Sequence, residues 1–134
     1  MIINCYLGFD GQCKEAFEFY QKVFGGEIVM MMAYGDSPVG EQIPEDQRGR
    51  IMYTRLDIGA NVLMGGDSPT QFPGKAQGFS VSITLECIEE GQRVFSALSE
   101  NGSVMMRFEK SFFSAGFGML TDQYGIPWMI NVAA

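Results

Sequence analysis

The pattern that most limits the possible folds of this chain is a pair of amphipathic helices repeated 75 positions apart. Apolar residues between positions 13 and 24 recur at the i, i+3, i+4, i+7 spacing of one helical face, and the same spacing returns between positions 89 and 100. The two sets are Ala16, Phe19, Tyr20, Val23 and Gly91, Val94, Phe95, Leu98. A match of this kind indicates an internal duplication.

Predicted strands follow the same order around each helix. The first half has strand patterns at 2–9, 27–34, 49–58 and 61–66, and Gly25 and Gly26 end its helix. The second half has strand patterns at 79–87 and 103–108 and ends in a hairpin around the turn at 122–125. The sequence therefore predicts an α+β fold of two βαβββ modules in a single domain, residues 1–134, with repeats at about 1–66 and 78–134. One helix covers only one face of each sheet, so we expect the halves to share a core or to curve around a space.

The last predicted strand carries different side chains on its two faces. Alternation places Trp128, Ile130 and Val132 on one face, and Met129 and Asn131 on the other. One interpretation is that the first face packs on a helix and the second lines a hollow. The other is an ordinary two-sided core strand with Asn131 near its end.

Composition excludes several classes of function. Nine Lys and Arg against sixteen Asp and Glu give a formal net charge of −7, which opposes binding to nucleic acid and to anionic membranes. No apolar run approaches the roughly 18 residues of a membrane-spanning helix. The first residues lack the basic region of a signal peptide, and three widely spaced cysteines form neither a disulfide framework nor a CxxC site. We therefore expect a cytoplasmic protein with no nucleic-acid or membrane partner.

The chain contains no histidine. This removes the commonest general base and the imidazole ligand that zinc, iron, nickel and copper favour. A Ser-His-Asp or Cys-His mechanism is therefore excluded. Any chemistry must use carboxylates, cysteine, tyrosine, lysine or an all-oxygen metal site.

Three stretches resemble a known family: YLGF at 6–9, CKEAFEFY at 13–20 with FGG at 24–26, and GFGMLTDQYGIPWMIN at 116–131. Over essentially its whole length the chain resembles the PhnB-like branch of the vicinal oxygen chelate, or glyoxalase/bleomycin-resistance, superfamily. The resemblance implies two βαβββ modules forming a cup-shaped mixed sheet with the helices on its outer face, and a homodimer. Relatives that carry a metal hold it at the base of the cup with His and Glu side chains.

The resemblance also maps those metal-ligand positions onto this chain. They fall on Cys5, Met64, Met129 and either Ser80 or Ser82. A thiol, two thioethers and a hydroxyl do not make a hard octahedral site. Many PhnB-like relatives have a further histidine on the third strand, where this chain has Tyr53. We therefore expect a cup with no metal and no other cofactor.

We expect this cup to bind a small, largely apolar molecule. The chain has ten methionines, and unbranched thioethers adapt to varied apolar partners, although they also fill gaps in ordinary cores. Phe113 and its neighbour Phe112 form either a mobile lid or a loop fixed by its own rings. The candidate ligand-binding residues are Cys5, Tyr53, Met64, Ser80, Ser82, Phe113, Met129 and Asn131.

Whether the chain is an enzyme stays open from the sequence. It is also compatible with a metal-independent isomerase or lyase for a small oxygenated substrate, with Tyr53 or Glu86 as the acid or base. A drug-sequestering resistance protein and a dimerisation scaffold with a filled cup fit the same residues. The methyltransferase label used for this branch finds no support, because no glycine-rich loop between a strand and a helix is followed by an acidic partner about 20 residues later.

Overall fold

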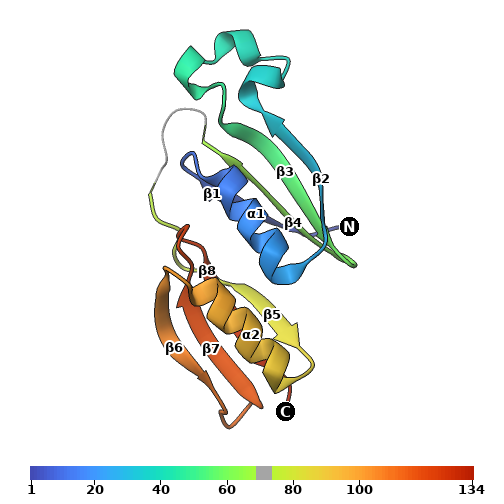
Figure 1. Ribbon diagram of the computed structural model, residues 1–134, viewed down its shortest axis with the longest axis vertical. Helices are drawn as coiled ribbons and strands as arrows, with labels where there is room; N and C mark the ends of the chain where they lie inside the picture. The colour runs from blue at the N-terminus through green and yellow to red at the C-terminus, as the bar shows by residue number, and fades with distance from the viewer. Residues whose placement is uncertain (69–73) are drawn as a thin grey trace. The chain divides into compact units, whose positions relative to one another are not determined.

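The computed structural model describes residues 1–68 and 74–134 (Figure 1). The chain forms two compact units, Met1–Pro73 and Gly74–Ala134, which we call unit 1 and unit 2. Unit 1 contains the following elements: β1 Cys5–Phe9, α1 Cys13–Phe24, β2 Glu27–Ala33, β3 Ile51–Ile58 and β4 Asn61–Asp67. Unit 2 contains the equivalent set: β5 Val81–Leu85, α2 Ile88–Ser99, β6 Ser103–Glu109, β7 Gly116–Thr121 and β8 Pro127–Val132.

The two units have the same sheet topology, as the predicted duplication requires. The strand order is β1-β4-β3-β2 in sheet 1 and β5-β8-β7-β6 in sheet 2. In each sheet the first and last strands of the unit pair in parallel, and the other neighbours pair antiparallel. The α+β class with two βαβββ modules is therefore confirmed. That the two modules form a single domain stays a prediction.

The segment between β2 and β3 contains three short 3₁₀ turns: Tyr34–Asp36, Gly40–Gln42 and Glu45–Gln47. Its acidic side chains are exposed to solvent: Asp36, Glu41, Glu45 and Asp46. Among the described residues, no helix is long and apolar enough to cross a membrane.

Helix α1 packs on one face of sheet 1. Its buried residues are Cys13, Ala16, Phe17, Tyr20 and Val23, so Phe17 takes the place in the core that the sequence assigned to Phe19. The ring of Phe17 meets Phe9 of β1 edge to face, with centroids 6.1 Å apart. Phe19 is only half-buried. The spacing rule alone did not distinguish these two positions, because both fall near the edges of the same apolar stripe.

A glycine in β4 makes room for Phe17. A Cβ atom built on Gly65 would lie 2.6 Å from Cε1 of Phe17 and 2.7 Å from the carbonyl oxygen of Leu7. The rigid ring and the backbone leave little room to adjust, so this close approach of helix and sheet requires glycine at position 65.

Replacing Gly65 with alanine is expected to lower the free energy of unfolding by about 1–3 kcal/mol through overpacking. Urea denaturation followed by far-UV circular dichroism measures the loss. Gly49→Ala is the matched control, since nothing lies within 4 Å of a Cβ at Gly49 and its φ is not positive. Equal stability of the two variants would contradict the packing argument.

Unit 2 buries the equivalent helix face as predicted. Gly91, Val94, Phe95 and Leu98 of α2 are all buried. From Trp128 to Val132 on β8 the buried and half-buried residues alternate, and the buried set is the one expected to pack on a helix: Trp128, Ile130 and Val132. This confirms the predicted division of β8 into two different faces.

Candidate ligand-binding faces

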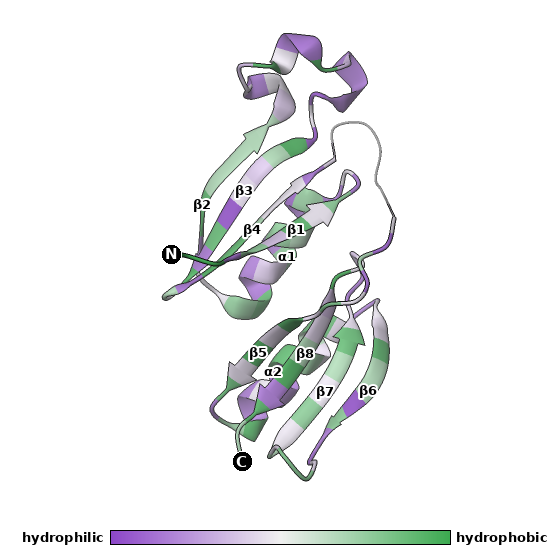
Figure 2. Cartoon of the chain, turned by 180° about the vertical axis from the view of Figure 1, so that it is seen from behind, coloured by the Kyte–Doolittle hydropathy of each residue, from purple (hydrophilic) through white to green (hydrophobic). Residues whose placement is uncertain are grey.

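Sheet 1 has one face that α1 does not cover, which we call its helix-free face (Figure 2). A row of paired residues crosses this face. Tyr6 of β1 lies opposite Met64 of β4, Met64 lies opposite Arg55 of β3, and Arg55 lies opposite Met30 of β2. Tyr53 is two residues before Arg55 and therefore faces the same way.

Cys5 lies on the opposite side of sheet 1 from Met64. It pairs with Leu63 and alternates in phase with the buried residues Leu7 and Phe9, on the face that α1 covers. This corrects the expectation that Cys5 and Met64 line one surface. The sequence could have predicted this placement. If the apolar residues Leu7 and Phe9 point into the core, alternation along the strand places Tyr6 on the helix-free face and Cys5 on the other face.

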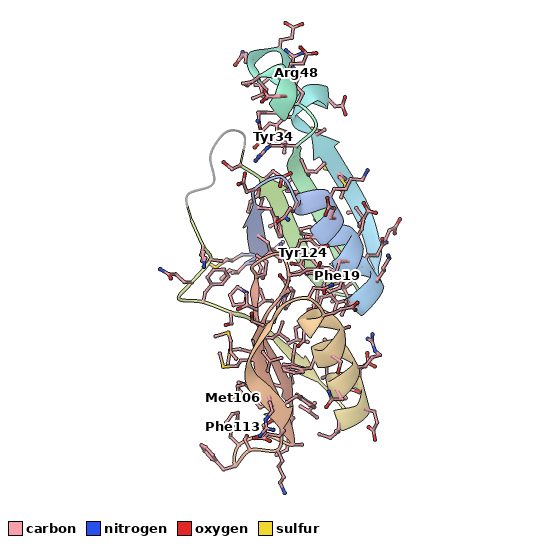
Figure 3. The ribbon with its side chains drawn as sticks, turned by 60° about the vertical axis from the view of Figure 1, so that its left-hand side comes forward. Phe19, Tyr34, Arg48, Met106, Phe113 and Tyr124 are labelled. Carbon is pink, nitrogen blue, oxygen red and sulfur yellow. The ribbon has the colours of Figure 1, made fainter. Side chains whose placement is uncertain are left out.

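Two tyrosines near the end of this face hold their hydroxyl groups against backbone oxygens. Tyr34 donates to the carbonyl of Asp67 at 2.9 Å, and Tyr6 makes a longer bond of 3.4 Å to the carbonyl of Met52. Burial, and then the neighbouring Tyr34, Cys13, Asp67 and Tyr53, raise the pKa of the Tyr6 phenol. Burial and Asp67 likewise raise the pKa of Tyr34, which Arg50 partly offsets. Figure 3 labels Tyr34 at this end of unit 1.

We expect Tyr6→Phe to reduce the loss of stability at alkaline pH. The pKa of Tyr6 is higher in the folded chain than the ordinary tyrosine value of 10.0. The neutral phenol therefore contributes stability that is complete below that value and is lost as the pH rises through the folded pKa. The free energy of unfolding, measured at pH 8 and pH 11, should fall less in the variant than in the wild type. Equal losses in the two chains would contradict this prediction.

The helix-free face of sheet 1 also carries a charged pair. Nε of Arg55 lies 2.6 Å from an oxygen of Asp57, and the two side chains are 42% and 34% exposed. The hydrogen bond to Asp57 is the main reason that the pKa of Arg55 is raised. Any ligand on this face therefore meets a neutralised ion pair beside Met64.

Sheet 2 has an equivalent helix-free face. Met106 of β6 lies opposite Met119 of β7, Met119 lies opposite Met129 of β8, and Met129 lies opposite Ser82 of β5. Asn131 is two residues after Met129 and faces the same way. Among the candidates named from the sequence, the structure therefore brings together Ser82, Met129 and Asn131, and Ser80 continues the alternation just before β5 begins.

Phe113 lies at the edge of this face, in the loop between β6 and β7. Its ring packs edge to face on Phe112 and on Phe117, with centroids 5.1 Å apart in both pairs. The hydroxyl of Ser114 bonds the carbonyl oxygens of Gly116 and Val132. Within the loop, the backbone N–H of Ser111 donates to the carbonyl oxygen of Ser114 at 3.1 Å. These contacts favour the loop fixed by its own rings. Figure 3 shows Phe113 and Met106 at the same end of unit 2.

Met106, Met119 and Tyr6 are not among the candidate residues named from the sequence. The internal duplication could have indicated Met106 and Met119, since they lie on β6 and β7, the strands equivalent to β2 and β3 of unit 1. Within residues 1–68 and 74–134, no group of three His, Cys, Asp or Glu side chains is placed to hold a metal ion. The residues described above on these two faces carry thioethers, aromatic rings, hydroxyls, one amide and one ion pair, and Glu109 adds a carboxylate opposite Phe117.

Comparison with known proteins identifies the family. A family model described as 3-demethylubiquinone-9 3-methyltransferase matches residues 1–131. Protein YjdN of Escherichia coli (strain K12) is 31% identical over 143 residues, covering 98% of this chain and 95% of YjdN. The crystal structure of PA1353 from Pseudomonas aeruginosa is 39% identical, with a TM-score of 0.91 over 99% of this chain and 98% of that one. A PhnB protein from Bacillus cereus is 28% identical, with a TM-score of 0.85 over 99% of this chain and 100% of that one.

More distant structures share the fold alone. A glyoxylase/bleomycin resistance protein/dioxygenase domain from Frankia sp. EAN1pec is 8% identical with a TM-score of 0.68, and the fosfomycin resistance protein FosX from Listeria monocytogenes is 7% identical with a TM-score of 0.69. Each alignment spans this whole chain and at least 94% of the other. The chain therefore belongs to the PhnB-like family, whose model is described as 3-demethylubiquinone-9 3-methyltransferase, with the fold of the glyoxalase/bleomycin resistance/dioxygenase superfamily.

Proposed function

We propose that this protein binds a small, largely apolar molecule on the helix-free faces of its sheets, without a metal ion. The observation that carries the proposal is the equivalence of Met64 and Met129. Each lies next to the parallel edge strand of its sheet, on the face without a helix, and each is half-buried. Thioethers adapt to varied apolar partners, and Ser82 and Asn131 beside Met129 are the kind of sparse polar group that orients a small ligand.

The phenol of Tyr6 is suited to binding a ligand rather than to acting as a base. A phenol whose pKa is raised by burial, as at Tyr6, stays protonated near neutral pH and acts as a hydrogen-bond donor. An isomerase or lyase would require a base, and Glu86 lies exposed just after β5. Sequestration of a drug would be a special case of binding, distinguished only by the molecule that is held.

Thermal denaturation in the presence of uncharged apolar compounds tests the proposal. A ligand at about 100 times its dissociation constant should stabilise the folded chain by roughly 2.7 kcal/mol. Met129→Lys should remove the part of this stabilisation that comes from the face of sheet 2, because a charged ammonium group opposes an apolar ligand. Val39→Lys, at an exposed position between β2 and β3, is the control that should retain it.

Metal analysis of the same purified sample tests the second half of the proposal. We expect no transition metal at stoichiometric level. A stoichiometric metal would contradict the metal-free site, and a chain that no apolar compound stabilises would contradict ligand binding itself.

We also propose that the protein is a cytoplasmic homodimer. Large apolar side chains of β6 and the following loop are exposed: Val104 49%, Met105 61%, Phe112 100% and Phe113 52%. β6 is also an edge strand of sheet 2, and an exposed edge strand invites pairing with a second chain. Sedimentation should give the mass of two chains, and Phe112→Ser should shift it toward that of one.

A further inference from the structure

The two helix-free faces differ at one equivalent position. Each face has a row of three paired residues, one from each of the three neighbouring strands that pair antiparallel. The row is Met30, Arg55, Met64 in sheet 1 and Met106, Met119, Met129 in sheet 2. Arg55 and Met119 therefore occupy the same place in their sheets, and only sheet 1 has a charged residue there.

The partner of that charge is also replaced in sheet 2. Asp57, which binds Arg55, stands two residues after it, whereas Thr121 stands two residues after Met119. The hydroxyl of Thr121 donates to the sulfur of Met105 at 3.3 Å. The place that Arg55 has in sheet 1 thus carries a thioether in sheet 2, and the charged residue on this face, Glu109 of β6, lies opposite Phe117 and not in the row. β7 is green to white along its length in Figure 2.

We propose that the row Met106–Met119–Met129, the methionine row, binds an uncharged aromatic ring of the ligand. The proposal rests on the ligand-binding function proposed above and names the chemical class of the ligand. Thioether sulfur makes favourable contacts with aromatic rings at about 5 Å, and paired residues on neighbouring strands stand at roughly that same spacing. Three sulfurs in a row therefore offer a polarisable strip about 10 Å wide.

The surroundings of the methionine row fit the same ligand. Phe117 stands two residues before Met119 and faces the same way, and its ring centroid lies 5.1 Å from that of Phe113. Ser82 ends the row with a hydroxyl, and Asn131 adds an amide beside Phe117. A neutral hydroxyl or carbonyl on the ring would find a partner there, whereas a charged substituent would lose its hydration over the thioethers.

Calorimetric titration with 1-naphthol and decahydro-1-naphthol tests this inference. The two alcohols share one carbon skeleton and one hydroxyl group, but only 1-naphthol is aromatic. We expect the wild-type chain to bind 1-naphthol more tightly. Met119→Leu keeps the apolar bulk and removes the sulfur, so it should weaken 1-naphthol about two- to tenfold and change decahydro-1-naphthol by less than about twofold.

A double variant introduces the charge that sheet 1 carries. Met119→Arg with Thr121→Asp places a copy of the Arg55–Asp57 pair in sheet 2, at a position where sheet 1 accommodates it. It should weaken 1-naphthol by more than about tenfold, because the ring would meet hydrated charges. Val39→Arg, which adds the same charge at an exposed position outside both helix-free faces, is the matched control and should not weaken binding.

The outcomes separate this inference from the proposed function. Equal affinity of the wild-type chain for both alcohols, or unchanged 1-naphthol binding in the Met119 variants, would overturn the aromatic ligand while binding of an apolar molecule stands. If neither alcohol binds and no other apolar compound stabilises the chain, the inference and the proposed function are both overturned.

Discussion

Replacing Asp122 with alanine is expected to lower the free energy of unfolding by about 3–4 kcal/mol, since each buried donor left without a partner costs roughly 1–3 kcal/mol. The carboxylate is 3% exposed and accepts three hydrogen bonds within unit 2. One oxygen binds the backbone N–H of Tyr124 at 2.8 Å and of Ile126 at 3.0 Å, and the other binds the indole N–H of Trp128 at 2.8 Å. A single side chain thereby shapes the β7–β8 turn and joins it to the core.

The fluorescence of Trp128, the only tryptophan of the chain, reports on this site directly. Urea denaturation should show a lower midpoint for Asp122→Ala and a changed emission maximum before unfolding, because the indole N–H loses its acceptor. Asp122→Asn keeps one carbonyl oxygen and should lose less. The control Asp57→Ala removes a carboxylate from a partly exposed ion pair and should cost no more than about 1 kcal/mol. Similar losses for Asp57→Ala and Asp122→Ala would show that the buried network contributes little.

Asp67→Ala is expected to have an effect of similar size, about 3–4 kcal/mol, in unit 1. The side chain ends β4 and joins three segments that are distant in the sequence. One oxygen accepts the N–H of Gly11 at 2.8 Å and of Cys13 at 3.0 Å, and the other accepts the N–H of Ile51 at 2.9 Å. The turn after β1, the first residue of α1 and the first residue of β3 all depend on it.

This variant also tests whether the chain is one cooperative domain. Asp67 lies in unit 1, whereas Trp128 lies in unit 2. If both units unfold in one transition, as the predicted single domain requires, Asp67→Ala should shift the Trp128 fluorescence transition and the far-UV circular dichroism transition equally. A fluorescence midpoint that stays at the wild-type value would show that unit 2 unfolds independently. Asp67→Asn should restore part of the stability of Asp67→Ala if hydrogen bonding is the cause.

Local signals in the sequence predicted the elements well. The bounds of α1 are those expected from its apolar spacing and the glycines that follow Phe24, and the terminal hairpin turns around Asp122 as expected. The first strand begins later than expected, at Cys5, because residues count as a strand only where they pair with a neighbouring strand, and the pairing of β1 with β4 starts at Cys5 and Leu63. Alternation alone gives no such limit.

Local signals did not predict the roles of the two buried aspartates. The predicted strand at 61–66 ended just before Asp67, and Asp122 was marked only as a turn residue. Their partners lie on segments that the fold brings together, such as Gly11 and Ile51 around Asp67. A polar side chain buried among backbone donors looks the same in a sequence as one exposed in a loop.

The sequence by itself determined the duplicated βαβββ order, the family, and a chemistry without imidazole, because these depend on residue types and their spacing along the chain. Only the tertiary structure decided which face each side chain occupies. In the structure Cys5 lies on the helix side of sheet 1 and Tyr6 lies on its helix-free face. Met106, Met119 and Met129 lie in one row on the helix-free face of sheet 2. The physical reason is that side chains alternate every residue along a strand, so the pairing register between strands determines which residues share a surface.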